Sequence, residues 1–199
     1  MKKSIQNFIA EVANSDVSII TTAELKAKNL NAYDIDKLVK EGHIKRIKRG
    51  IYKISDESGD YGKLQESAFC VPNGVICLTS AQYYHGLIKR EPNQIAIAIP
   101  HKAKKPMLPK YLNIKLYYFT EPRYSLGRTL FYDLGTECYD MEKSICDAIY
   151  YRKKLGTEIA KEALITYLQR KDKDIDKLIE YGENLRVGKI LKNYLEVLL

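Results

Sequence analysis

Apolar residues near the N-terminus recur with a helical period. Ile5, Phe8, Ile9 and Val12 are spaced by three and four positions, which places them on one face and predicts an amphipathic helix over residues 3–13. After this helix, capping and turn residues interrupt the pattern. The following segment is therefore expected to contain short, separate elements.

Capping residues predict two more helices. Thr21 is followed three positions later by Glu24, a capping box that predicts a short helix over residues 22–28. Asn29 then tolerates the left-handed backbone of a tight exit. Asn31 can cap a third helix. Two helices joined by such a short turn have the geometry of a helix-turn-helix.

A β-hairpin is predicted directly after the third helix. Gly42 ends that helix, and β-branched residues occur in segments 43–47 and 50–55. Gly50 supplies the positive φ that a tight turn at residues 48–50 requires. A hairpin in this position makes the arrangement a winged helix.

Positive charge is concentrated in this part of the chain. The 199 residues have a formal net charge of +8, and residues 1–55 carry 11 Lys and Arg against 6 Asp and Glu. A basic balance favours nucleic acid as a partner, or less often an anionic membrane surface. The predicted wing holds Lys45, Arg46, Lys48 and Arg49, which repel one another unless water or phosphates surround them.

These features predict a surface that reads duplex DNA. The third helix can lie in a major groove while the wing follows the backbone or enters a minor groove, where Arg46 or Arg49 suits a narrow A·T tract. The candidate DNA-binding residues are Thr21, Thr22, Asn31, Tyr33, Lys37, Lys40, Lys45, Arg46, Lys48 and Arg49. A basic hairpin that is only solvated surface is the alternative.

The polar, acidic and glycine-containing segment 55–62 predicts a linker. We expect a winged helix-turn-helix domain at residues 1–56 and a C-terminal domain at residues 61–199. In the latter, the pattern predicts helices at 63–69 and 78–87, strands at 93–100, 113–120 and 128–134, and then four helices with apolar faces starting at Met141, Ala160, Ile175 and Val187. Several helices packed on a small β-sheet make an α+β fold.

The cysteines favour a reducing compartment. Cys70, Cys77, Cys138 and Cys146 lack the spacing of a metal clip. The N-terminus has no uninterrupted apolar core of a signal peptide, and no run approaches transmembrane length. We therefore expect a cytoplasmic protein with no membrane contact and with free, mostly buried thiols.

No catalytic or metal-binding motif is found. The glycines are isolated, so a phosphate loop or dinucleotide fingerprint is not expected. Five carboxylates between residues 172 and 183 match acidic positions of a calcium loop, but Lys177 stands where that loop requires glycine. We predict that the protein is not an enzyme and uses no metal or cofactor.

The segment TTAELKAKNLNAYDIDKLVKEGHIKRIKRGIYKI (21–54) resembles the N-terminal winged-helix domain of the AbiEi family of antitoxins, which belong to phage-defence operons. The family pattern places a basic turn before Arg-Gly-Ile/Val-Tyr, here residues 49–52. LTSAQYYHGL, DMEKSICDAIYYRKKLGTEIAKEAL and RVGKILKNYLEVL resemble later parts of the family. Relatives often have glycine in the turn between the two small helices, where this chain has Asn29.

The resemblance implies a repressor that binds repeats in its own promoter, generally cooperatively, and thereby controls its own operon. It also implies an antitoxin that counters a nucleotidyltransferase-like toxin without requiring a stable complex, through the C-terminal domain. The cationic candidates for that activity are Lys102, Lys104, Lys105, Arg152, Lys153, Lys154 and Arg186. For the run at 150–154 the helix dipole alone is a sufficient explanation.

Two other functions stay open. One is a nucleic-acid-targeting enzyme such as a nuclease, although the strands QIAIAI and IKLYYF contain none of the carboxylates that would hold Mg²⁺. The other is an RNA-binding or interaction protein, in which the aromatic residues 117–119 would stack on bases. A core role for those aromatic residues is the alternative.

Overall fold

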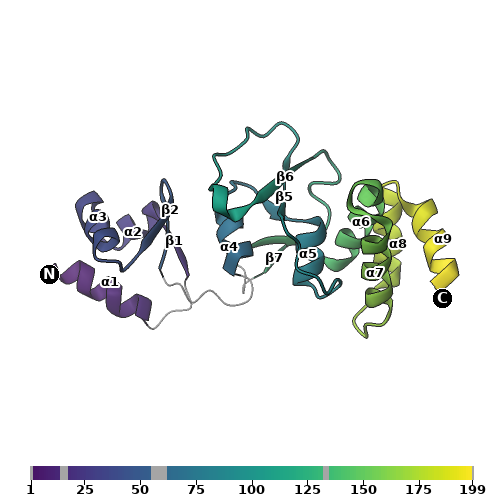
Figure 1. Cartoon of the computed structure of the whole chain (residues 1–199), viewed down its shortest axis with the longest axis horizontal. Helices are drawn as coiled ribbons and strands as arrows, with labels where there is room; N and C mark the ends of the chain where they lie inside the picture. The colour runs from purple at the N-terminus through teal and green to yellow at the C-terminus, as the bar shows by residue number, and fades with distance from the viewer. Residues whose placement is uncertain (1, 14–17, 55–61, 132–134, 199) are drawn as a thin grey trace.

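The computed structural model describes residues 2–13, 18–54, 62–131 and 135–198, and it has an α+β fold, as predicted. Figure 1 shows three groups of elements in a row. Short helices and strands come first, a second sheet lies in the middle, and a group of helices lies at the C-terminal end. We call residues 2–54 the N-terminal part and residues 62–198 the C-terminal part.

The N-terminal part has the predicted helices and hairpin. Its elements are α1 (Lys3–Ala13), β1 (Ile19–Thr21), α2 (Thr22–Ala27), α3 (Ala32–Lys40), β2 (Lys45–Lys48) and β3 (Ile51–Lys53). The three strands form an antiparallel sheet in the order β1-β3-β2. Strand β1 is not part of the sequence prediction, because three residues are too few to show a period.

The predicted capping box at Thr21 and the predicted cap at Asn31 are both present, and Asn31 also forms a capping box. The Thr21 side chain accepts a hydrogen bond from the Glu24 backbone N–H, and Asn31 accepts one from that of Asp34. Asn29 has the left-handed backbone expected of it, with φ 61°. The apolar faces of these helices meet the sheet in one cluster, formed by Ile5, Phe8, Ile20, Leu25, Leu30, Ile35, Leu38, Ile44 and Tyr52. Burial of this cluster supplies the stability that such short helices lack on their own.

The C-terminal part contains a five-stranded mixed sheet and a helical group. Its elements are α4 (Gly62–Phe69), β4 (Val75–Ile76), α5 (Leu78–Tyr84), β5 (Ile95–Pro100), a 3₁₀ turn η1 (Lys110–Leu112), β6 (Ile114–Phe119), β7 (Arg128–Phe131), β8 (Thr136–Tyr139), α6 (Met141–Leu155), α7 (Thr157–Leu168), α8 (Ile175–Asn184) and α9 (Gly188–Leu198). The strand order is β6-β5-β4-β8-β7. The predicted helices and the three predicted strands are present, although residues 132–134 of the strand predicted at 128–134 lie outside the described residues, whereas β4 and β8 are additions.

The predicted linker at 55–62 lies outside the described residues except for its last position. That position, Gly62, begins α4. Contacts nevertheless join the two described parts across it, since the Lys48 Nζ donates to the Cys70 carbonyl at 2.6 Å. The Ser18 hydroxyl also donates to the Gln65 side chain.

Strand β5 is buried on both faces, which explains its uninterrupted apolar sequence. Its isoleucines Ile95, Ile97 and Ile99 face one apolar cluster, packed among others against Leu64 of α4. The small residues between them, Ala96 and Ala98, face a second cluster that contains Phe119 and Tyr139. One face of this strand is therefore bulky and the other nearly flat.

A buried ion cluster joins the sheet to the helices. Lys143 and Asp147, one turn apart on α6, form an ion pair in which neither side chain is exposed. Arg123 also pairs with Asp147, and it donates to the Leu185 carbonyl at 3.0 Å, between α8 and α9. Burial lowers the pKa of Lys143, and the contact with Asp147 opposes that shift. The ammonium lies 4.1 Å from the centroid of the Tyr139 ring, which also favours the charged form.

Removing the carboxylate of this cluster should destabilise the protein strongly. Asp147→Ala leaves the Lys143 ammonium buried without its anion, a loss that typically costs about 3–5 kcal/mol. Urea unfolding followed by circular dichroism measures it. The matched control is Glu158→Ala, which removes one partner of the exposed Lys161–Glu158 pair and should cost about 0–1 kcal/mol. Equal losses in the two variants would contradict a stabilising role for the cluster.

Candidate nucleic-acid interface

Helix α3 presents a polar face with balanced charge. Tyr33 is 76% exposed near its start. Lys40 pairs with Asp36 at 2.8 Å, and Lys37 lies 3.7 Å from the Glu41 carboxylate. The hydrogen bond that the Lys40 ammonium donates to the Asp36 carboxylate raises the pKa of Lys40. Exposed pairs of this kind are weak, so both lysines can exchange their carboxylates for phosphates.

The start of α3 is fixed by contacts that occupy two of its polar side chains. The Asn31 Oδ1 accepts the Asp34 backbone N–H at 3.0 Å. The Asp34 carboxylate is buried and accepts hydrogen bonds from the Lys2 ammonium, at 2.7 Å, and from the Asn31 backbone. These bonds lower the pKa of Asp34. The amide nitrogen of Asn31 is the group of this cap that can reach a base edge.

The hairpin divides its four predicted cations into two groups. Lys45, Arg46 and Arg49 are exposed. Lys48 is half-buried, because its ammonium donates to the Cys70 carbonyl just beyond α4. The sequence predicts DNA contacts for all four, but the structure leaves only Lys45, Arg46 and Arg49 exposed to make them.

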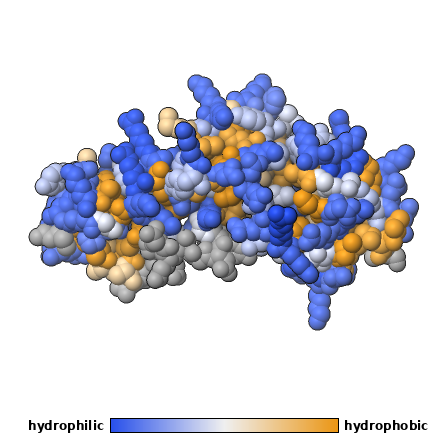
Figure 2. Space-filling model, in the orientation of Figure 1, coloured by the Kyte–Doolittle hydropathy of each residue, from blue (hydrophilic) through white to orange (hydrophobic). Residues whose placement is uncertain are grey.

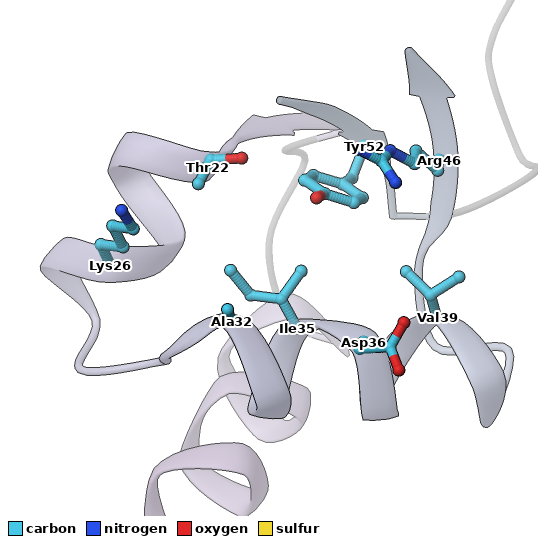
Figure 3. Close-up of a pocket in the computed structure, with 8 residues that line it drawn as sticks. All are labelled: Thr22, Lys26, Ala32, Ile35, Asp36, Val39, Arg46 and Tyr52. Atoms are coloured by element: carbon cyan, nitrogen blue, oxygen red, sulfur yellow. The ribbon is translucent and has the colours of Figure 1, made fainter. Parts of the chain in front are cut away.

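A cleft lies between the helices and the hairpin (Figure 3). Its volume is about 320 Å³. Ile35 and Val39 give α3 an apolar side facing the cleft, while Lys26 of α2 and Arg46 of β2 stand on opposite sides of it. Sequence analysis missed Lys26, a cation in the last turn of α2, because its place beside the cleft depends on how α2 and α3 pack.

The turn of the hairpin is tied to the first small helix. The Thr22 backbone N–H donates to the Gly50 carbonyl at 2.9 Å, and Gly50 has φ 86°, as predicted for the turn residue. The hydroxyl of Thr21, also a DNA-binding candidate, is engaged with the Glu24 carboxylate at 2.7 Å. The hairpin, α2 and α3 are therefore held as one unit, which fixes the relative positions of the exposed cations.

The cationic candidates of the C-terminal part fall on separate segments. Lys102, Lys104 and Lys105 are exposed after β5, Arg152, Lys153 and Lys154 lie in the last turn of α6, and Arg186 lies between α8 and α9. The Arg152 guanidinium donates to the Ile149 carbonyl at 2.8 Å, a contact within its own helix. These candidates therefore come from three different segments of the C-terminal part.

Successive aromatic side chains of β6 point to opposite faces of the sheet, as in any β-strand. Tyr117 packs against the apolar cluster of Phe119 and Tyr139, while Tyr118 is 41% exposed. A continuous stacking surface for bases does not form on one face of this strand. The core role weighed for these side chains holds for Phe119, whereas Tyr117 is partly buried.

The cysteines and carboxylates have structural positions. All four cysteines are buried, and burial raises the pKa of Cys70 to about 11 and that of Cys146 to about 12.

In the calcium-like segment, the Asp174 side chain caps α8 by accepting the Lys177 backbone N–H. Within residues 2–13, 18–54, 62–131 and 135–198, no group of three or more potential ligands is placed to hold a metal ion. In the same ranges, no helix has the length and apolarity needed to cross a bilayer.

Residues 7–54 match the model of a protein family described as transcriptional regulator, AbiEi antitoxin. This match confirms the predicted resemblance for that segment, which includes α2, α3 and both strands of the hairpin. The resemblance of the segments beyond residue 54 stays a prediction. No curated protein sequence matches the chain.

Two substitutions at Asn31 should test its role as the cap of α3. Asn31→Ala removes the acceptor that caps α3 and should lower the free energy of unfolding by about 1 kcal/mol. Asn31→Asp keeps an acceptor in place, so its stability should be close to that of the unmodified protein. Thermal unfolding of the two variants tests this, and an equally large loss in Asn31→Asp would contradict the capping role.

Proposed function

We propose that residues 3–54 form a winged-helix domain that binds duplex DNA, and that the protein is a transcriptional regulator and antitoxin. The main support is the exposed cationic hairpin held beside α3, within the segment that matches the family of regulators. The element order of three helices with a hairpin after the third is that of winged-helix domains.

In the proposed complex, α3 lies in the major groove. Tyr33 and the amide nitrogen of Asn31 lie near its start, where reading helices contact base edges. Lys37 and Lys40 exchange their carboxylate partners for phosphates. Lys45, Arg46 and Arg49 of the hairpin contact the adjacent backbone, and either arginine fits a narrow minor groove.

The finer part of the proposal rests on the family resemblance. The protein acts in the cytoplasm, binds inverted repeats in the promoter of its own operon, and associates cooperatively there. It counters a nucleotidyltransferase-like toxin without a stable complex, and it has no catalytic activity of its own. The candidates for this second role are the cationic residues Lys102, Lys104, Lys105, Arg152, Lys153, Lys154 and Arg186.

Binding to promoter DNA should depend steeply on salt. If the domain neutralises about 4–6 phosphates, log Kobs should fall against log salt concentration with a slope of about −4 to −5 per bound copy. Arg46→Ala combined with Arg49→Ala should reduce that slope by about 2. Fluorescence anisotropy with a labelled promoter duplex, over a series of salt concentrations, gives the slope.

Two control variants test this prediction further. Lys48→Ala should leave the slope unchanged because its ammonium is bound to the Cys70 carbonyl. Lys189→Ala, at an exposed position on α9, should also leave it unchanged. If the arginine variants keep the full slope, the hairpin is not the phosphate-binding element. If Lys48→Ala lowers the slope as the arginines do, Lys48 leaves Cys70 in the complex.

The antitoxin role should be separable from DNA binding. Co-expression with a toxin encoded by the neighbouring reading frame should arrest growth unless this protein is active. The variant with alanine at Arg46 and Arg49 should still restore growth, because the proposed antitoxic region lies in the C-terminal part. A variant with glutamine at Lys102, Lys104 and Lys105 should restore growth less well. Loss of rescue in the hairpin variant alone would place the activity in the N-terminal part.

A further inference from the structure

A second pocket lies in the C-terminal part, away from the proposed DNA surface. It is formed by the segment before β5, by strands β5 and β6, and by the junction of α6 and α7. Its volume is about 470 Å³, within the range of about 300–1,000 Å³ that is typical of small-molecule sites. The proposed DNA contacts do not involve this pocket, and of the cationic candidates for the antitoxin role only Lys154 lines it.

The alternation of residue size along β5 explains why the pocket is hollow. In the parallel pairing of β5 with β6, Ala96 lies opposite Lys115 and Ala98 opposite Tyr117. The isoleucines of β5 face the other side of the sheet, and Ala96, the β5 residue that lines the pocket, has only a methyl group where a large side chain would fill the space. Leu155 at the end of α6 and Ile159 of α7 close the apolar wall.

Three cations line this hollow, namely Arg90, Lys115 and Lys154. Among the residues that the structure describes, no carboxylate lies within the 4.0 Å of an ion pair from any of their charged groups. By contrast, the lysines of α3 and Lys161 of α7 each lie near a carboxylate. With two carboxylates also in the lining, the pocket keeps a net positive charge, and its three cations are free of close ion pairs with the described residues, which favours an anionic occupant.

The remaining lining suits a flat ring that carries polar edges. The Tyr117 ring lies at the pocket, 5.5 Å from the Lys115 ammonium. The side-chain amides of Asn93 and Gln94 supply donors and acceptors at the same site. Of the two carboxylates present, Glu162 already accepts the Lys89 backbone N–H at 3.0 Å, and Glu91 can accept a hydroxyl group.

We propose that this pocket binds a nucleoside phosphate. The phosphate groups contact Arg90, Lys115 and Lys154, and the base lies against Tyr117 and the apolar wall of Leu155 and Ile159. An inorganic polyanion satisfies the cations but leaves the apolar wall in contact with water. The nucleoside is therefore the part of the ligand that gives the site its selectivity.

The test is isothermal titration of the full chain with ATP and, separately, with GTP at about 150 mM salt. The background carries alanine at Arg46 and Arg49, so that the hairpin cations cannot account for the binding. We expect one saturable site for at least one of the two nucleotides. Lys115→Gln and Lys154→Gln should each weaken binding about tenfold, as expected for the loss of a charge-assisted hydrogen bond.

A matched control and a neutral variant make the test specific. Lys161→Gln removes a lysine of α7 that pairs with Glu158 on the surface, and it should leave the affinity unchanged. Ala96→Val fills part of the hollow without changing charge, and it should weaken binding while circular dichroism confirms the fold. If Ala96→Val does not fold, the nucleotide affinities of Lys115→Gln and Lys154→Gln still test the proposal.

Three outcomes would overturn the proposal. One is the absence of saturable binding of either nucleotide up to about 1 mM. Another is a nucleotide affinity that stays the same in the Lys115→Gln and Lys154→Gln variants as in the protein with the unmodified pocket. The third is binding of inorganic pyrophosphate as tight as that of the nucleotide, because the base would then make no contribution. None of these outcomes bears on DNA binding by the hairpin, so the two proposals can fail separately.

Discussion

Four positive charges within the five residues 45–49 are the constraint on which the N-terminal part depends. Charges this close cannot all point the same way without cost. Lys48 turns toward the C-terminal part and binds the Cys70 carbonyl, while Lys45, Arg46 and Arg49 remain in solvent. The same short hairpin thus supplies both a surface suited to phosphates and a contact between the two parts of the chain.

The elements of the N-terminal part could be predicted because their causes are local. The capping boxes at Thr21 and Asn31, the left-handed Asn29 and the turn at Gly50 each depend on residues a few positions apart. Strands β4 and β8 are not predicted, since β4 has only two residues and the sequence TECY of β8 does not alternate between polar and apolar positions. They form because pairing with distant strands satisfies their backbone groups.

The candidate sites show the same division. The exposed cations of the hairpin follow directly from the sequence, but Lys48 finds its partner 22 residues away. The second pocket combines positions 90, 115 and 154, which no spacing rule connects. Lys143 and Asp147 are spaced like a surface helix pair, and only the sheet and helices packed around them make that pair buried.

The bond from Lys48 ends on a main-chain oxygen, not on a side chain. Every amino acid at position 70 carries that oxygen, so exchange of the cysteine leaves the acceptor in place. The contact should therefore survive substitution of Cys70, because it depends only on Lys48 and on the path of the backbone after α4. Which side chain can occupy position 70 is then decided by the space around it.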